Sequence, residues 1–228
     1  MFGPIMYFCL WAPLNVMRRI WWRWHVEGLE KLPPPGQGFI IAANHLDWMD
    51  IPIVGASLPL RYRPWWMAKI ELFTSKFAVW WFAKMRVIPI KRGKRDLSAF
   101  IACEKALKEG GALIVFPEGH RSETGALQEA KGGIVRLSVR SACPIVPVAI
   151  WGTEHGLRGM MRRRQVTVRF GTPFYPNVEG SHIPWDRMND LTDESMLQIA
   201  ALLPEQYWGF YREHMLKKHH AQLEGERS

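Results

Sequence analysis

The fold is decided by residues 38–50, GFIIAANHLDWMD, where an apolar run ends on polar residues able to do chemistry. The run at 38–43 predicts a strand, and Asn44, His45 and Asp50 follow it directly. Five residues of helix would leave the His45 and Asp50 side chains roughly 140° apart. The two can meet only if the chain turns tightly, as a strand end followed by a turn allows.

Five further apolar runs lie along the chain, with helical patterns between them. This alternation is typical of an α/β layer fold. The clearest helix begins after Asp96, a residue type that caps helices, and stops at Gly110. We therefore predict one α/β domain over 25–221, with a mostly parallel or mixed sheet flanked by helices, and a polar tail at 222–228. The predicted strands are 38–43, 65–68, 86–90, 112–116, 145–151 and 165–170, and the other predicted helices are 71–85, 132–141 and 191–221 with a break at Pro204.

Charge and tryptophan are unevenly distributed. The 228 residues carry 30 Lys and Arg against 21 Asp and Glu, a formal net charge of +9. Residues 1–95 hold 14 basic and 5 acidic side chains, so the whole excess of positive charge lies there. The same residues hold nine of the 12 Trp. With 48% hydrophobic residues the chain is neither disordered nor fibrous. The three cysteines form no C-x-x-C pair, which excludes a disulfide scaffold or zinc ribbon and fits a reducing compartment.

The first 24 residues predict a membrane-surface anchor that does not cross the bilayer. Residues 1–17 are uncharged but contain Pro4, Pro13 and Asn15, and basic residues follow the apolar stretch rather than precede it as in a signal peptide. Arginines at 18, 19 and 23 alternate with Trp, a mixture suited to the headgroup layer. A similar mixture of Trp with Lys and Arg recurs at 61–86. The alternative is an N-terminal helix docked on the core.

His45 and Asp50 are the residue types of a general-base pair. A carboxylate hydrogen-bonded to one imidazole nitrogen fixes the tautomer, and the other nitrogen can then remove a proton from a hydroxyl. The spacing alone is weak, because a structural His is the commoner outcome, and Asp47 competes for the same imidazole.

Three further segments carry residues suited to an anionic substrate. FPEGHRS at 116–122 follows an apolar run and offers Glu118 and Arg121 at a sheet edge, where α/β folds bind ligands. The basic run KRGKR at 91–95 contains Arg92, and Lys131, Gly132 and Gly133 precede a helix whose N-terminus favours an anion. Each is an ordinary surface feature when taken alone. KRGKR and the arginines at 162–164 also suggest nucleic-acid binding, but the chain has no helix-turn-helix, zinc-finger or RNP pattern.

Taken in order, these segments resemble the four sequence blocks of the phospholipid/glycerol acyltransferase family, which includes 1-acyl-sn-glycerol-3-phosphate acyltransferases. The resemblance covers roughly residues 20–212, and four ordered blocks make it specific. His120 stands where the family usually has Thr, which adds a possible cation beside the site. The blocks are Asn44, His45 and Asp50; Lys69, Glu71 and Leu72 with VIPIKRG and its Arg92; FPEGHRS with Lys131 and Gly132; and IVPVAI with Pro147.

The resemblance implies transfer of a fatty acyl group from acyl-CoA or acyl-carrier protein to the hydroxyl of lysophosphatidic acid, giving phosphatidic acid. His45 would remove the hydroxyl proton and Asp50 would steady the imidazolium. It implies no cofactor, no metal, and no nucleophilic Cys or Ser. The residues implied to bind substrate are Arg92, Glu118, Gly119 and Arg121, and those implied to stabilise the oxyanion or support the site are Asn44, Lys69, Lys131, Gly132 and Pro147.

Two alternatives remain open on the sequence alone. The acceptor could be another lysolipid or glycerol phosphate, or the protein could be a catalytically degenerate binder of anionic membranes. In each case the expected partners are a phospholipid surface and lipid substrates, with no nucleic acid. The expected location is peripheral or monotopic on the cytoplasmic face of a bacterial cell membrane.

Overall fold

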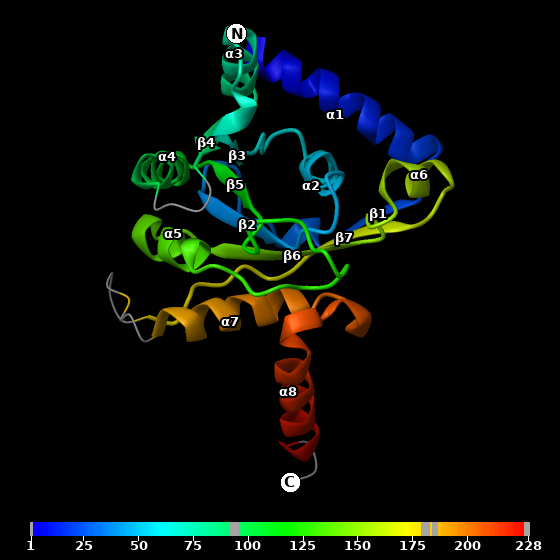
Figure 1. The fold of residues 1–228 in the computed structure, drawn as a ribbon, viewed down its shortest axis with the longest axis vertical. Helices are drawn as coiled ribbons and strands as arrows, with labels where there is room; N and C mark the ends of the chain where they lie inside the picture. Colours follow the sequence, from blue (N-terminus) through cyan, green and yellow to red (C-terminus); the bar gives the residue numbers. More distant parts are fainter. Residues whose placement is uncertain (1, 92–95, 179–182, 184–186, 226–228) are drawn as a thin grey trace.

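A computed structural model describes residues 2–91, 96–178, 183 and 187–225. Its main sheet has five strands in the order β1-β7-β6-β2-β5, and every neighbouring pair is parallel except β6 with β7. The predicted α/β domain with a mixed sheet flanked by helices is therefore confirmed (Figure 1). The strands are β1 (Trp24–Glu27), β2 (Phe39–Ala43), β5 (Ala112–Val115), β6 (Ile145–Trp151) and β7 (Val166–Phe170).

A second, two-stranded parallel sheet consists of β3 (Trp66–Lys69) and β4 (Val87–Ile90). A single parallel bridge between Trp65 and Leu113 joins it to the edge of the main sheet. All six predicted apolar runs are strands, whereas β1 was not predicted. It has only four residues and begins at Trp24, which the sequence grouped with the basic and aromatic N-terminal stretch.

Helices cover both faces of the main sheet, and each face has its own buried cluster (Figure 1). Strand residues alternate between the clusters, since Ile40 and Leu113 face one while Ile41 and Ile114 face the other. The first face packs against α4 (Leu97–Lys108), α5 (Gly133–Ser141) and α7 (Arg187–Ala200), and the second against α2 (Asp50–Ser57) and α1 (Phe2–Ile20). The remaining α-helices of the described chain are α3 (Lys76–Lys84), α6 (Gly156–Met161) and α8 (Arg212–Gly225), and its 3-10 turns are Leu29–Lys31, Ile70–Leu72, Glu205–Tyr207 and Gly209–Tyr211.

Helix ends follow local capping chemistry. The Asp96 side chain accepts a hydrogen bond from the Ala99 amide at 3.1 Å and begins α4, as predicted. The helix predicted over 71–85 is instead a 3-10 turn followed by α3, because Ser75 caps a new helix by accepting from the Ala78 amide. In the C-terminal third the predicted break occurs at Pro204, which precedes a 3-10 turn.

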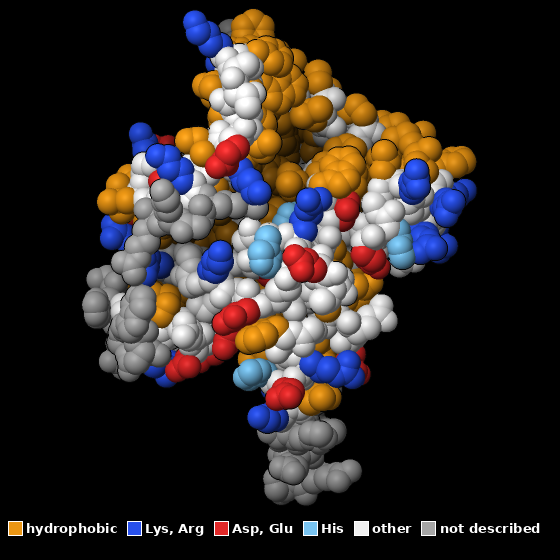
Figure 2. Space-filling view, viewed as in Figure 1, with side chains coloured by type: hydrophobic (Ala, Val, Ile, Leu, Met, Phe, Trp, Pro, Cys, Tyr) orange, Lys and Arg blue, Asp and Glu red, His pale blue; other side chains and the backbone are white. Residues whose placement is uncertain are grey.

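Helix α1 docks on α2 through polar contacts along one side. The Tyr7 hydroxyl donates to the Gly55 carbonyl, the Trp11 indole to Leu58 and the Asn15 amide to Ala56. The other side is apolar and faces outward (Figure 2), and within the described residues no helix is long and apolar enough to cross a membrane. The exposed apolar side chains of α1 include Phe2, Ile5, Phe8, Val16 and Ile20.

Candidate active site

The carboxyl ends of β2, β5 and β6 meet at one edge of the main sheet, because these three strands run parallel. Asn44, directly after β2, is fully buried and ties that end to β6. Its amide donates to the Ile150 carbonyl and accepts from the Ile150 N–H, both at 2.8 Å. Asn44 therefore supports the edge of the sheet with both ends of its amide group already engaged.

His45 and Asp50 meet in a buried hydrogen bond. The imidazole Nδ1 lies 2.9 Å from Oδ2 of Asp50. The same carboxylate oxygen accepts backbone N–H groups from Leu46 at 2.5 Å and Asp47 at 2.8 Å. Asp50 is completely buried as the first residue of α2. The tight turn that the five-residue spacing requires is therefore present.

Asp47, the competing partner for the imidazole, has a different place in this turn. Its side chain accepts from the Met49 amide at 3.0 Å, and its carbonyl accepts from the Asp50 amide at 3.1 Å. These two bonds close the turn between β2 and α2. Asp47 therefore positions Asp50, while Asp50 holds His45.

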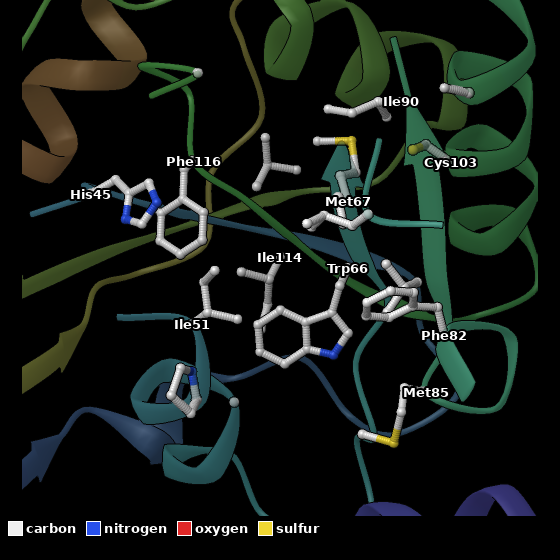
Figure 3. A pocket seen from close by; sticks show the side chains of 18 of the residues that line it. His45, Ile51, Trp66, Met67, Phe82, Met85, Ile90, Cys103, Ile114 and Phe116 are labelled. Carbon is white, nitrogen blue, oxygen red and sulfur yellow. The ribbon is translucent and has the colours of Figure 1, made fainter. Parts of the chain in front are cut away.

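Two contacts orient the imidazole of His45: the hydrogen bond to Asp50 at its edge and an aromatic ring against its face. The Phe116 ring, just beyond β5, stacks on it at 4.1 Å between centroids and 21° between planes. The His45 side chain is 8% exposed and borders a large cavity (Figure 3). Because Nδ1 is engaged by the carboxylate, Nε2 is the nitrogen left to exchange a proton.

Glu118 is buried beneath this turn and links two loops. One carboxylate oxygen accepts from the His45 backbone N–H at 2.8 Å, and the other accepts from the Gln128 N–H at 2.9 Å. Burial raises the pKa of Glu118 to about 7, against the lowering effect of these two hydrogen bonds. With both oxygens engaged and the residue 1% exposed, the geometry suits positioning of the His45 backbone better than direct substrate contact.

A cavity of about 830 Å³ opens beside His45, a volume in the range of small-molecule sites. It extends from the imidazole toward α3 and α4, and Figure 2 shows a hollow lined by hydrophobic side chains beneath α1 and α3. Figure 3 shows side chains from several elements pointing into it. Its apolar lining includes Leu10, Trp11, Ile51, Trp66, Met67, Phe82, Met85, Ile90, Phe100, Cys103, Ile114 and Phe116.

A few ionisable side chains interrupt this apolar lining. Besides His45, they include Lys91, Asp96 and Lys131. The Lys131 ammonium lies over Gly119, 3.5 Å from where a β-carbon on that glycine would sit. Gly119 has a φ of +77°, so a side chain there would strain the backbone. The cavity therefore combines a mostly apolar lining with two lysines, one aspartate and the imidazole of His45.

The other residues implied by the resemblance lie farther from the cavity or do not line it themselves. Lys69 is exposed at the end of β3 and Arg121 is exposed beyond Gly119, and neither borders the cavity. Pro147 lies within β6 opposite Ala42, deep in the sheet. Gly132 precedes α5, and its neighbours Lys131 and Gly133 line the cavity. Arg92 lies outside the described residues.

Sequence reasoning missed Phe116 as a neighbour of His45 and Lys91 as a residue of the cavity lining. Phe116 was part of the quoted FPEGHRS block, but its role as a stacking partner depends on where β5 ends beside β2. Lys91 begins the basic run in which only Arg92 was singled out, and it borders the cavity. Among the described residues, no group of three or more His, Cys, Asp or Glu side chains could hold a metal ion.

Comparison with known proteins identifies the family. The acyltransferase family model matches residues 23–151, which include His45, Asp50 and Glu118. The chain therefore belongs to the acyltransferase family, and the resemblance read from its ordered blocks is confirmed.

Similar proteins include 1-acyl-sn-glycerol-3-phosphate acyltransferase of Bacillus subtilis, 29% identical over 74% of this chain and 83% of the relative. The chloroplastic 1-acyl-sn-glycerol-3-phosphate acyltransferase BAT2 of Brassica napus is 27% identical over 73% of this chain, which spans about half of that relative's length (48%). The fold matches the crystal structure of the 1-acyl-sn-glycerophosphate (LPA) acyltransferase PlsC from Thermotoga maritima. The TM-score is 0.64 at 24% identity, covering 87% of this chain and 77% of the other.

Proposed function

We propose that the protein transfers a fatty acyl group from a thioester, either acyl-CoA or acyl-carrier protein, to the free hydroxyl of lysophosphatidic acid, giving phosphatidic acid. The observation that carries this proposal is the His45–Asp50 pair at the border of a large apolar cavity. The names of the similar proteins support lysophosphatidic acid as the acceptor.

In the proposed reaction the acceptor hydroxyl gives its proton to Nε2 of His45 as its oxygen attacks the thioester carbonyl. Asp50 stabilises the imidazolium through its bond to Nδ1. The tetrahedral intermediate then collapses, the carbon–sulfur bond breaks, and the thiolate leaves with the proton that His45 received. The imidazole is thereby returned to its starting state without a cofactor, metal ion or covalent acyl-enzyme.

The oxyanion and the acceptor phosphate both need positive partners. Lys131 is the best-placed cation for either, because its ammonium lies over Gly119 at the cavity border near His45. Lys91 borders the same cavity, and Arg121, which is exposed and does not border the cavity, is a further phosphate ligand implied by the resemblance. We assign the phosphate to these cations together with Arg92, and we leave the Gly132 amide and Lys69 as further oxyanion donors for mutational test.

The apolar cavity is the proposed site of an acyl chain. Its lining is almost entirely aliphatic, aromatic and thioether, so burying a hydrocarbon there stabilises binding by about 0.8 kcal/mol for each methylene. The cavity begins at the imidazole, which places the carbonyl end of such a chain beside His45. Lipid substrates also agree with the outward apolar side of α1, which we propose rests on the cytoplasmic face of a bacterial membrane.

Purified protein given one acyl-CoA and a panel of acceptors tests this function through release of free thiol. The panel contains lysophosphatidic acid, glycerol 3-phosphate and lysolipids with other headgroups, and it is repeated with acyl-carrier protein as donor. We expect the fastest thiol release with lysophosphatidic acid. Faster turnover with another acceptor would reassign the substrate, and no turnover with either donor would favour a catalytically inactive membrane-binding protein.

A further inference from the structure

We propose that α6 and the turn after it form a second membrane-contact surface that binds the phosphates of anionic lipids. This surface, here called the arginine patch, consists of Leu157, Arg158, Met161, Arg162, Arg163 and Arg164. The inference rests on the proposed action of the enzyme at a membrane, and it assigns the run of arginines at 162–164 that the reaction does not use.

The first observation is a cluster of cations without carboxylate partners. All four arginines of the patch are exposed, and none of them forms an ion pair with any described residue. Other arginines of the chain do form such pairs, as the half-buried Arg169 does with Glu27 and the exposed Arg212 with Glu205. An uncompensated cluster of this kind attracts a surface of opposite charge.

The second observation is that the patch continues the end of α1. The Trp21 indole donates to the Met161 carbonyl at 3.3 Å, and the Arg163 guanidinium lies 5.5 Å from the centre of the Trp21 ring. Figure 1 shows α6 beside the C-terminal end of α1, and Figure 2 shows Lys and Arg side chains gathered there next to the apolar side of α1. Arg19 and Arg23 at that end are exposed as well. The cations thus border the apolar surface that we propose lies on the membrane.

The third observation is that exposed apolar side chains lie among the arginines. Leu157 is 44% exposed and Met161 is 52% exposed, and Trp21 beside them is 44% exposed. Trp, aliphatic groups and Arg in one surface suit the boundary between headgroups and acyl chains. A nucleic acid would be met by cations and stacking rings, whereas projecting aliphatic side chains gain nothing from a phosphate backbone. The composition therefore favours an anionic lipid leaflet as the occupant.

Arg163 provides a test that does not harm the fold. It has a φ of +57° at the end of α6, a left-handed conformation that glycine adopts more easily. Arg163→Gly therefore removes one cation of the patch and also relieves the strain of the left-handed backbone conformation. A loss of binding in this variant, with an unchanged or raised melting temperature, reports on the cation alone.

The experiment measures cosedimentation with vesicles of pure phosphatidylcholine and with vesicles that also contain phosphatidylglycerol. Each cation near an anionic surface contributes about 1 kcal/mol. We therefore expect the anionic-vesicle affinity to fall about fivefold in Arg163→Gly and at least about tenfold in the Arg158→Gln and Arg162→Gln double variant. Binding to neutral vesicles stays at the parent level. Lys217→Gln with Lys218→Gln, an equal charge loss on exposed residues of the distant α8, is the matched control and keeps the parent affinity.

Parent-like binding of both patch variants to anionic vesicles would overturn the proposal. An equal loss on neutral and anionic vesicles would also overturn it, since the lost contact would then not depend on lipid charge. Normal vesicle binding with a selective loss of affinity for acyl-carrier protein would show instead a docking surface for an acidic protein. With short-chain substrates dissolved below their micelle concentrations, we expect the patch variants to release thiol at the parent's rate. If the proposed reaction itself is wrong, the parent is inactive in this assay, so that failure is distinguished from a failure of the arginine patch.

Discussion

Nδ1 of His45 lies 2.9 Å from Oδ2 of Asp50, and that single oxygen also accepts two backbone N–H groups from the turn between them. The carboxylate is therefore held in place by the chain that carries the imidazole. Its own position is fixed at the start of α2, where the positive end of the helix dipole favours a negative charge. The turn therefore holds the pair in place before any substrate binds, which suits the proposed general-base role.

Asp50→Asn tests the charge of this pair. An amide can keep a hydrogen bond to the ring but stabilises the imidazolium much less than a carboxylate does. We expect thiol release to slow by about 10²-fold or more, within the range for impaired general-base catalysis.

Asp47→Asn is the matched control for that variant. Asp47 belongs to the same turn but bonds to the Met49 amide rather than to the imidazole. Its replacement should change turnover by less than about tenfold, because Asn can also accept from a turn amide. Equal losses in the two variants would mean that the turn, rather than the charge of Asp50, determines the rate.

Glu118→Gln tests the buried carboxyl that holds the His45 backbone. The pKa of Glu118 in the folded protein is about 7 against its usual 4.5, so the folded state keeps this proton to higher pH than the unfolded chain does. The contribution of Glu118 to stability is therefore largest below pH 4.5 and falls as the pH rises to 7. The difference of about 2.5 pH units corresponds to about 3 kcal/mol.

Denaturant unfolding at pH 5 and pH 8 measures this effect. The parent should lose stability between the two values, and Glu118→Gln should lose less, because the amide does not titrate. The variant should also turn over more slowly at pH 8, since its NH2 group then faces a backbone N–H whose hydrogen bond the parent's carboxylate accepts, and the two rates should come closer at pH 5, where the parent's carboxyl is protonated. Identical pH slopes for the two proteins would refute the titration of Glu118.

Arg121→Ala tests whether Arg121 binds the phosphate of the acceptor. Arg121 is exposed near Gly119, so its loss should weaken the acceptor without disturbing the fold. We expect the KM for lysophosphatidic acid to rise about tenfold with kcat little changed, as for a hydrogen bond to a charged group. Arg136→Ala, an exposed arginine on α5, is the control. A parent-like KM in Arg121→Ala would remove this residue from the phosphate site.

Trp66→Ala tests the apolar cavity as the acyl-chain site. The Trp66 ring borders the cavity and packs closely against Gly55 of α2. A β-carbon on that glycine would lie 2.5 Å from the ring. Removing the ring enlarges the cavity, so competition between acyl-CoA donors should shift toward longer chains. Trp80→Ala removes an indole of α3 that is 45% exposed and does not border the cavity, and it should leave the preference unchanged. The same preference in Trp66→Ala as in the parent would place the chain elsewhere.

The sequence predicted the sheet well because its central strands β2 and β6 are continuous apolar runs. Strand β2 is buried at all five positions and β6 at six of seven, so both are apolar throughout. Strand β1 escaped prediction because only its first residue is buried, so no apolar run marks it in the sequence. That residue, Trp24, is 4% exposed, yet in the sequence it resembles the exposed Trp21 nearby.

The sequence predicted those site residues that directly follow a strand. It did not predict contacts with backbone groups that are far away in the sequence. His45 and the FPEGHRS block each follow a parallel strand, which places them at one edge of the sheet. The partners of Glu118 are backbone amides, one of them 73 residues away, and no side-chain pattern reports such a bond. The cavity likewise depends on how α1, α3 and α4 pack around the sheet, which residue spacing does not determine.

Thiol release by His45→Ala, with acyl-CoA and lysophosphatidic acid, tests the central claim most directly. The variant should stay folded and bind vesicles as the parent does, because the His45 backbone contacts remain, with a melting temperature lowered by the loss of the bond to Asp50 and of the stacking on Phe116. Its rate should fall by about 10²- to 10⁴-fold, the typical loss on removing a general base. A folded variant that releases thiol at nearly the parent's rate would contradict the assignment of His45 as the base.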